Sequence, residues 1–167
     1  MEFFSPAQQS FQPHFWTENP ITSDAQVQIY EELVTDPQGL LTSFLSLDHR
    51  VKDNRIQAQG RSLTGPGADI TAPVRTGSDP SYKRGCGCSV VRYEVPLTAV
   101  VGASAVRATL FYQSIPPYYL RQRLEQGHGS DIARLITFVK KLKISQYPAI
   151  ANWKLQIATS GAINVGP

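Results

Sequence analysis

The chain of 167 residues has little charge, little sulfur and no long apolar segment. Charged side chains make up 17% of it, and a net charge of +3 is too small by itself to indicate a nucleic-acid partner. No apolar run approaches the roughly 20 residues of a membrane-spanning helix, so we expect no membrane span. The sequence does not open with a basic segment followed by an apolar one, so we expect no secretory signal peptide.

The motifs of common catalytic and cofactor sites are also missing. The sequence has no Cys-x-x-Cys-His motif, so we expect the chain to bind no haem c covalently. It has no Gly-x-Ser-x-Gly elbow, no P-loop, no dinucleotide-binding glycine motif and no His-Glu-x-x-His zinc motif. The three histidines, His14, His49 and His128, are scattered, and we do not expect them to converge on a metal. These absences favour a protein that is not an enzyme, with no catalytic and no cofactor-binding residue.

The only two cysteines, Cys86 and Cys88, lie in a Gly-Cys-Gly-Cys sequence. One residue separates them, whereas redox and zinc motifs have two, and no second pair completes a zinc site. Three interpretations stay open. They are two free thiols at the entrance of a strand, a local disulfide, and a site for a soft metal such as copper. The third depends on the fact that residues two apart on a strand point to the same face.

Glycine and proline, by contrast, are frequent, with 12 of each. Both interrupt α-helices, so they exclude a helical bundle and favour short segments joined by turns. The Asp-Pro-Gln-Gly sequence at 36–39 predicts a type I turn between two strands of a hairpin. Alternating apolar residues predict strands at 27–34, 41–47, 89–97, 106–115 and 153–158, with a further one at 51–56.

Two helices are expected before the last strand. The first is short and runs from Pro116 to Glu125, since proline is tolerated in a first helical turn. The second has Ser130 as its N-cap candidate, an apolar stripe from Ile132 to Leu142 and lysines at its end. No strand–helix–strand alternation appears. We therefore predict a mainly β fold, an antiparallel β-sandwich (immunoglobulin-like or jelly-roll-like) with one or two short helices inserted before the last strand.

The same patterns predict how the chain is organised. Residues 1–24 are aromatic, punctuated by proline and without a period, so we expect an extended N-terminal arm. The sandwich domain is expected at 25–160, and a C-terminal tail at 161–167. Residues 57–85 are rich in glycine and proline and form a long loop, a kind of segment that is usually functional or mobile.

Two groups of side chains are candidates for partner binding. The aromatic rings of the arm either lie on the main body, where their burial stabilises the fold, or dock another protein. The basic residues between 121 and 143 form either a solvated helix face or a contact for an acidic partner, such as haem propionates or an acidic protein surface. The candidate contacts are Phe11, Phe15, Trp16, Arg121, Arg123, Lys140 and Lys141.

Two strings are the most specific in the chain: Lys-Asp-Asn-Arg-Ile at 52–56 and Tyr-Gln-Ser-Ile-Pro-Pro-Tyr-Tyr-Leu at 112–120. Together with 36–39, 42–47 and 152–155, they resemble the C-terminal β-rich region of some bacterial multihaem c-type cytochrome proteins. In those proteins the haem-bearing segment lies upstream. From the residues alone, we expect Asp53, Asn54 and Arg55 to satisfy local backbone groups and each other where strands cross.

The resemblance covers roughly residues 26–158 and implies an extracytoplasmic location, periplasmic or extracellular. It also implies that haem c sits on a partner or an upstream segment, and that the chain is a processed or partial product of a longer exported precursor. The function it implies is a non-catalytic accessory domain of a multihaem cytochrome electron-transfer system. Such a domain would shield haems, bridge subunits or dock partners.

Two other functions remain as alternatives. One is an extracellular β-sandwich module that binds glycans or surface proteins, with Tyr118, Tyr119 and Trp153 as stacking residues. The other is a small metal-dependent enzyme that uses Cys86 and Cys88. In each case we expect no nucleic-acid partner, and self-association into a homo-oligomer stays open.

Overall fold

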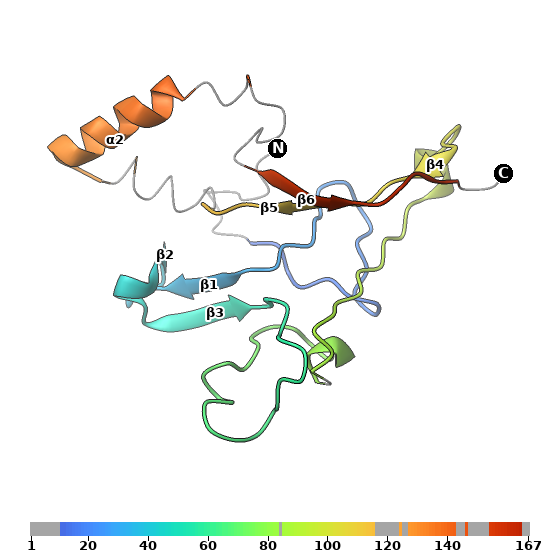
Figure 1. Ribbon diagram of the computed structural model, residues 1–167, viewed down its shortest axis with the longest axis horizontal. Helices are drawn as coiled ribbons and strands as arrows, with labels where there is room; N and C mark the ends of the chain where they lie inside the picture. Colours follow the sequence, from blue (N-terminus) through green and yellow to red (C-terminus); the bar gives the residue numbers. More distant parts are fainter. Residues whose placement is uncertain are drawn as a thin grey trace. The chain divides into compact units, whose positions relative to one another are not determined.

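The computed structural model describes residues 11–83, 85–115, 124, 127–142, 146 and 154–164. The chain forms two compact units, Met1–Val95 and Pro96–Pro167. Strand residues outnumber helix residues, and all the paired strands of the described residues are antiparallel (Figure 1). The chain is therefore β-rich, as the sequence predicts, and its sheets are small.

The first unit is built on a three-stranded sheet with the order β2-β1-β3 (Figure 1). The strands are β1 (Glu32–Thr35), β2 (Leu41–Thr42) and β3 (His49–Asp53). Val34 pairs with Thr42 on one side and with Arg50 on the other, and a bulge follows Leu33 in the pairing with β3. The central position of β1 explains why Leu33 and Val34 are buried.

The predicted turn at 36–39 is confirmed. The amide of Gly39 donates to the carbonyl of Asp36 at 2.9 Å, and the Asp36 side chain accepts from the amides of Gln38 and Leu40. Gly39 has a φ of +79°, in the left-handed region that glycine enters without steric cost. The turn joins β1 to β2 as a hairpin.

The strand predictions in the first unit need correction, because a segment forms a strand only where it has a partner. The strand predicted at 27–34 begins at Glu32, and the one predicted at 51–56 ends at Asp53 as part of β3. The segment at 41–47 is a strand only to Thr42, after which the chain passes through the 3-10 helix η1 (Phe44–Ser46) to the free side of β1. There β3 runs in the same direction as β2, antiparallel to β1. The segment at 89–97 makes one isolated parallel bridge, between Tyr93 and Ile21, and ends at Pro96, which has no amide to donate. The alternation of apolar residues does not predict whether a neighbouring strand is present to pair with the segment.

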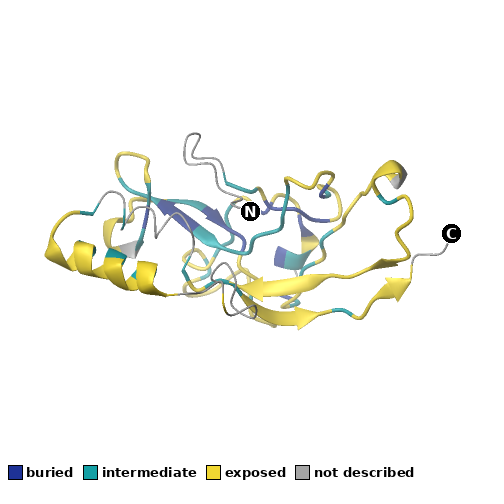
Figure 2. Cartoon of the chain, turned by 90° about the horizontal axis from the view of Figure 1, so that it is seen from above, coloured by how far each residue is buried: buried dark blue, intermediate teal, exposed yellow. Residues whose placement is uncertain are grey.

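The core of the first unit includes the rings of the N-terminal arm. Phe15 is 1% exposed and Trp16 is 8% exposed, and they share the interior with Ile21, Leu33 and Tyr82. Figure 2 shows that buried residues gather in this unit. The described part of the arm is thus packed as part of the unit.

The long loop at 57–85 carries no strand in its described residues, in agreement with the prediction, yet it is tied to the sheet. Asp53 and Val74 exchange two backbone hydrogen bonds, and the amide of Gly60 donates to the carbonyl of Gly85 at 2.7 Å. A 3-10 helix, η2 (Pro80–Tyr82), is capped by the side chain of Asp79 and buries Tyr82. These contacts give the segment a fixed path without regular structure.

The second unit contains two antiparallel ribbons and a helix. The 3-10 helix η3 (Leu97–Ala99) comes first, and the strands are β4 (Ala105–Val106), β5 (Thr109–Tyr112), β6 (Leu155–Thr159) and β7 (Ile163–Asn164). β4 pairs with β7, and β5 pairs with β6. The predicted strand at 106–115 is therefore two short strands, and the segment predicted as the last strand is followed by β7.

The helix α2 (Ser130–Lys141) confirms the clearest helix prediction. Its N-cap is Gly129, not Ser130 as expected, and no side chain caps it. Ile132, Ile136 and Val139 are half-buried, while the rest of the apolar stripe is exposed. The other predicted helix falls at 116–125, of which the structure describes only residue 124.

Candidate functional site

A buried set of polar side chains lies between the N-terminal arm, the end of β3 and the long loop. We call it the internal polar cluster; its members are His14, Gln28, Asn54, Asp79 and Tyr82. His14 Nε2 lies 2.9 Å from Asp79 Oδ2, and His14 Nδ1 lies 3.0 Å from Gln28 Nε2 and 3.1 Å from Asn54 Nδ2. The Tyr82 ring meets the imidazole edge-on at 5.2 Å.

The hydrogen bonds around the cluster indicate which ring nitrogen of His14 accepts and which donates. Gln28 Oε1 accepts from the amide of Phe15, and Asn54 Oδ1 accepts from the amide of Glu31. Both side-chain NH2 groups therefore face Nδ1, which must be an acceptor. Nε2 of His14 then donates to Asp79.

Asn54 is the centre of this network and is 0% exposed. Its NH2 group donates to the carbonyl of Ile29 at 2.8 Å and to His14, and its oxygen accepts from Glu31. Its backbone carbonyl accepts from the Tyr82 hydroxyl. A side chain with this many satisfied partners specifies one arrangement of the segments around it.

Lys52, the residue two before Asn54, is buried as completely. Its Nζ donates to Glu31 Oε1 at 2.9 Å and to the carbonyls of Gln12 and Ile29 at 2.8 and 3.1 Å. Burial lowers the pKa of Lys52, and the charge of Glu31 opposes that shift. A lysine with a lowered pKa is a functional candidate in a cleft, but all three protons of this one are used in internal bonds.

Asp53 and Arg55 form the outer end of the string. Arg55 Nε and Nη2 donate to the two carboxylate oxygens of Asp53 at 2.9 and 2.7 Å, and Arg55 also pairs with Glu32. The hydrogen bond to Asp53 raises the pKa of Arg55. The expectation that the three residues satisfy each other and the local backbone is confirmed for Asp53 and Arg55, whereas the side chain of Asn54 bonds Glu31, His14 and Ile29 instead.

The pair of His14 and Asp79 has the residue types of a general base and its orienting carboxylate. Its side chains, however, are only 1% and 3% exposed. Burial raises the pKa of Asp79, but hydrogen bonds from His14 and Ser81 outweigh it and leave this pKa below the ordinary value. The arrangement holds the arm, sheet and loop together, and it offers a substrate no approach through the described residues.

The Tyr82 hydroxyl permits a test of this network by pH. Burial, aided by electrostatic repulsion from Tyr30, Asp79 and Asp53, raises the pKa of Tyr82 above its ordinary 10.0. Because the unfolded chain loses this proton first, the folded state loses stability as pH rises above 10. We expect the free energy of unfolding to fall by about 1.4 kcal/mol from this group between about pH 9 and 11.

Comparing the wild type with Tyr82→Phe isolates that contribution, since other titrating groups are shared. The phenylalanine keeps the ring against His14 and removes only the hydroxyl. Urea unfolding at both pH values should show the wild type losing its advantage over the variant at high pH. Equal pH slopes for the two proteins would contradict the buried position of this hydroxyl.

An open hollow of about 270 Å³ lies on the β5–β6 ribbon. Its lining bears hydroxyl and apolar groups but no titratable one: Ala108, Thr109, Leu110, Ala158, Thr159 and Ser160. Among the described residues, no group of three or more His, Cys, Asp or Glu side chains is placed to hold a metal ion. The hollow therefore offers shape but no acid–base chemistry.

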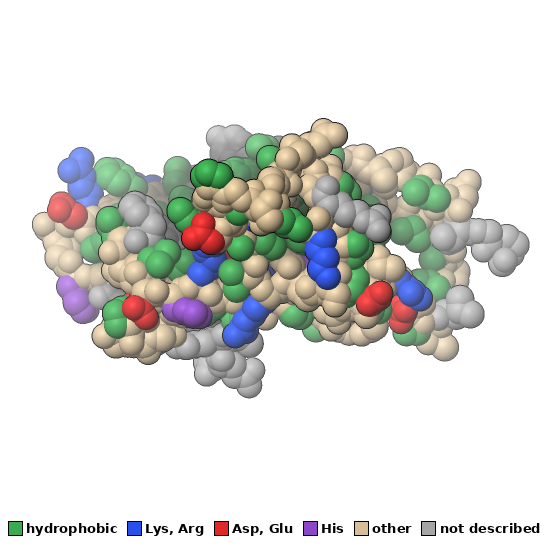
Figure 3. Space-filling view, turned by 90° about the horizontal axis from the view of Figure 1, so that it is seen from below, with side chains coloured by type: hydrophobic (Ala, Val, Ile, Leu, Met, Phe, Trp, Pro, Cys, Tyr) green, Lys and Arg blue, Asp and Glu red, His purple; other side chains and the backbone are tan. Residues whose placement is uncertain are grey.

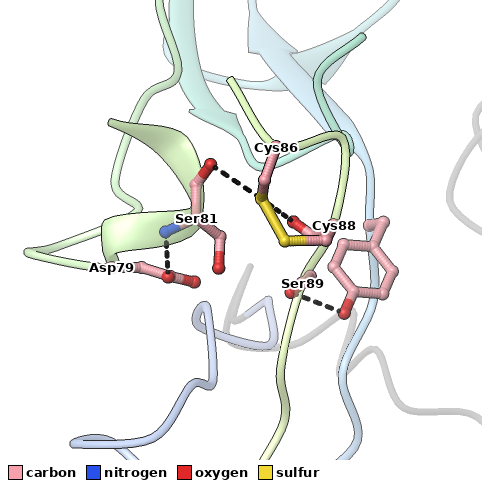
Figure 4. Close-up of a disulfide and its surroundings, with 6 residues drawn as sticks. Asp79, Ser81, Cys86, Cys88 and Ser89 are labelled. Atoms are coloured by element: carbon pink, nitrogen blue, oxygen red, sulfur yellow. Dashed lines mark hydrogen bonds between the residues drawn. A yellow bond between two sulfur atoms is a disulfide. The ribbon is translucent and has the colours of Figure 1, made fainter. Parts of the chain in front are cut away.

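The residues that the sequence predicts to bind a partner or a metal differ in how exposed they are. Cys86 and Cys88 are joined as a disulfide, so neither offers a thiolate to a metal or to an enzyme mechanism in this form (Figure 4). Phe11 is half-buried, with the Arg75 guanidinium 5.5 Å from its ring centre. Phe15 and Trp16 are inside the core, where they present almost no area to a partner.

Lys140 and Lys141 are exposed in the last turn of α2. The remaining candidates lie outside the described residues: Arg121 and Arg123 of the basic group, and Tyr118, Tyr119 and Trp153 of the glycan hypothesis. The sequence reasoning did not find the roles of His14 and Asp79. They are 65 positions apart and carry no local signal for each other.

No protein-family model, curated protein or solved structure matches this chain. In the part of the chain that the structure describes, no helix is long and apolar enough to cross a membrane. Functional inference therefore depends on the contacts described above and on the motif resemblance.

Proposed function

We propose that the chain is a non-catalytic accessory domain that assembles with an extracytoplasmic multihaem c-type cytochrome. Haem c would be carried by that partner or by an upstream segment. The observation that supports a structural role most directly is that the Lys-Asp-Asn-Arg string, residues 52–55, makes internal contacts. The string that carries the resemblance thus has a structural role inside the first unit. If the domain binds a partner, it would do so through its exposed surfaces.

The second unit supplies the candidate docking surface. Tyr112, Leu155 and Ile157 share one face of the β5–β6 ribbon and are each about half exposed. Phe111, which pairs with Gln156, lies on the other face. A two-stranded ribbon is only marginally stable in water, and clustered exposed apolar side chains usually mark interaction sites. We keep the antiparallel β-sandwich predicted from the sequence as part of this proposal, in which the small sheets would be parts of such a sandwich.

The charges of α2 favour an acidic partner. Arg134, Lys140 and Lys141 lie on this helix, and both lysines are exposed. On the face seen in Figure 3, hydrophobic side chains are interspersed with charged ones, and Lys and Arg do not gather in one patch. A surface with both apolar groups and carboxylates, for example one that exposes haem propionates, would complement these apolar and basic side chains. A nucleic-acid backbone, which presents phosphates alone, would complement them less well.

The experiment is affinity purification of the tagged chain from the extracytoplasmic fraction of its native host. We expect co-purifying material with a Soret absorbance band. The double variant Leu155→Ser/Ile157→Ser, which changes two neighbours on one face, should lose at least about 90% of that absorbance, since central apolar contacts dominate interfaces.

The matched control is Leu45→Ser, which removes an exposed apolar side chain from the first unit. This variant should retain the band. Absence of a Soret band from all co-purifying material, with the wild-type chain folded, would argue against a cytochrome partner. Equal loss in the control would remove the ribbon from the proposal.

A further inference from the structure

The disulfide between Cys86 and Cys88 spans a sequence separation of 2. A cross-link stabilises mainly by restricting the unfolded chain, and this effect decreases as the closed loop shortens. A bridge across a single residue therefore adds little to stability. Stabilisation of the fold therefore does not explain why the disulfide is present.

The segment that carries the bridge is already held by its neighbours. Gly85 and Gly87 have φ values of +59° and +65°. A Cβ added to Gly85 would lie 2.6 Å from the carbonyl oxygen of Arg61, and one added to Gly87 would lie 3.0 Å from the amide nitrogen of Gln59. The two glycines thus let this backbone lie directly against residues 59–61. Beyond the bridge, the Tyr30 hydroxyl donates to Ser89 Oγ at 2.9 Å.

The two cysteines differ in their access to solvent and in their surroundings. Cys88 is exposed, whereas Cys86 is half-buried. The Sγ atom of Cys86 lies 3.7 Å from the carbonyl oxygen of Ser81 and 3.6 Å from that of Cys88 (Figure 4). A thiol at Cys86 would have two acceptors at hand, while a thiolate there would face two oxygen lone pairs. Cys86 is therefore suited to remain a thiol, and Cys88 to react.

We propose that Cys86 and Cys88 form a redox-active site that exchanges with an external dithiol. Exposed disulfides are the ones that take part in thiol exchange, whereas buried structural ones resist reduction. The segment is fixed by contacts that do not involve sulfur, so the bridge opens and closes without unfolding the unit. This inference does not depend on the proposed cytochrome partner.

The exchange proceeds in two balanced steps. A thiolate of the external dithiol attacks Sγ of Cys88 and forms a mixed disulfide; the Cys86–Cys88 bond breaks, and Cys86 leaves with the electron pair and takes up a proton. The second thiolate of the dithiol then attacks its own sulfur partner in the mixed disulfide, and Cys88 leaves and takes up a proton. The dithiol becomes a disulfide, and the protein gains two electrons and two protons.

The first test treats the folded full chain with dithiothreitol and without denaturant, then labels thiols with iodoacetamide. We expect both cysteines to become reduced, with the melting temperature shifted by less than about 3 °C. Peptide mass spectrometry should find Cys88 labelled at least about fivefold faster than Cys86, since exposure and thiolate character set the rate. Oxidised dithiothreitol should restore the bridge.

The second test uses the matched variants Cys86→Ser and Cys88→Ser with oxidised glutathione. The first leaves the exposed thiol, and we expect it to form the mixed disulfide at least about fivefold faster than the second does. Circular dichroism checks that both are folded. The proposal is overturned if the bridge resists dithiothreitol until denaturant is added, if reduction or either substitution unfolds the chain, or if the two thiols react equally fast.

Discussion

Replacing Asn54 with alanine is expected to lower the free energy of unfolding by about 4 kcal/mol, because each buried polar group left without a partner costs about 1–3 kcal/mol. The substitution removes the acceptor for the amide of Glu31 and one of the two donors to His14 Nδ1. It also leaves a cavity at a site that is 0% exposed, which water could not fill without rearrangement. Urea denaturation followed by circular dichroism measures the loss.

Gln28→Ala is the matched control for this prediction. It removes the other donor to His14 Nδ1 and the acceptor for the amide of Phe15. Gln28 is only half-buried, so water can replace part of its bonding, and we expect a loss of about 1–2 kcal/mol. A loss for Asn54→Ala no larger than that of the control would show that Asn54 does not organise the internal polar cluster.

The parts of the fold that could be predicted have local causes. The turn at 36–39 depends on the conformational freedom of Gly39 and on the Asp36 side chain, all within four residues. The helix α2 follows from an apolar stripe read within a single segment. In both cases the residues that decide the structure are neighbours in sequence, so the pattern contains the cause.

The errors in the strand predictions have a non-local cause. Residues 89–97 alternate as well as residues 27–34 do, yet their backbone forms only an isolated bridge, to Ile21, whereas β1 has a strand on each side. A strand exists through its partners, and alternation carries no information about which segment returns beside it. The same limit explains why β3, placed by the bend of η1, pairs with β1 and not with β2.

In the candidate site, too, contacts between near neighbours in sequence could be predicted and contacts between distant residues could not. The bonds between Asp53 and Arg55 were predictable because these residues are near neighbours, whereas the partners of Asn54 are distant in sequence. The contact between His14 and Asp79 was not, and neither was the burial of Lys52 on an otherwise ordinary strand. For the cysteines, the spacing left three interpretations open, since nothing in a sequence determines the oxidation state of two neighbouring thiols.

The arm and the sheet are joined by the same residues that carry the resemblance. Lys52 reaches the carbonyl of Gln12, and Asn54 reaches His14, so two consecutive inward-facing positions of the string hold the arm. Phe15 and Trp16 then complete the core. The string therefore connects the N-terminal arm to the three-stranded sheet. This structural role accounts for its residues without any catalytic or binding role at the surface.

Lys52→Ala is expected to lower the free energy of unfolding by about 3 kcal/mol, at the lower end of the range for breaking a buried ion pair. The lower end applies because Glu31 is 19% exposed and regains some hydration when its partner is removed. The carbonyl of Gln12 loses its donor, whereas that of Ile29 keeps the bond from Asn54. Lys83→Ala, at an exposed position, is the control and should change stability by less than about 0.5 kcal/mol.

A double variant separates the ion pair from the space that Lys52 fills. Lys52→Met keeps the volume of the stem, and Glu31→Gln removes the opposing charge. Each alone leaves one charge without its counter-charge, whereas together they remove both charges. We expect the double variant to be within about 1 kcal/mol of the wild type, because replacing a buried pair by groups of similar volume is often neutral. The cycle then yields a coupling energy of about 2 kcal/mol. Additive losses would mean that Lys52 and Glu31 contribute to stability independently of each other.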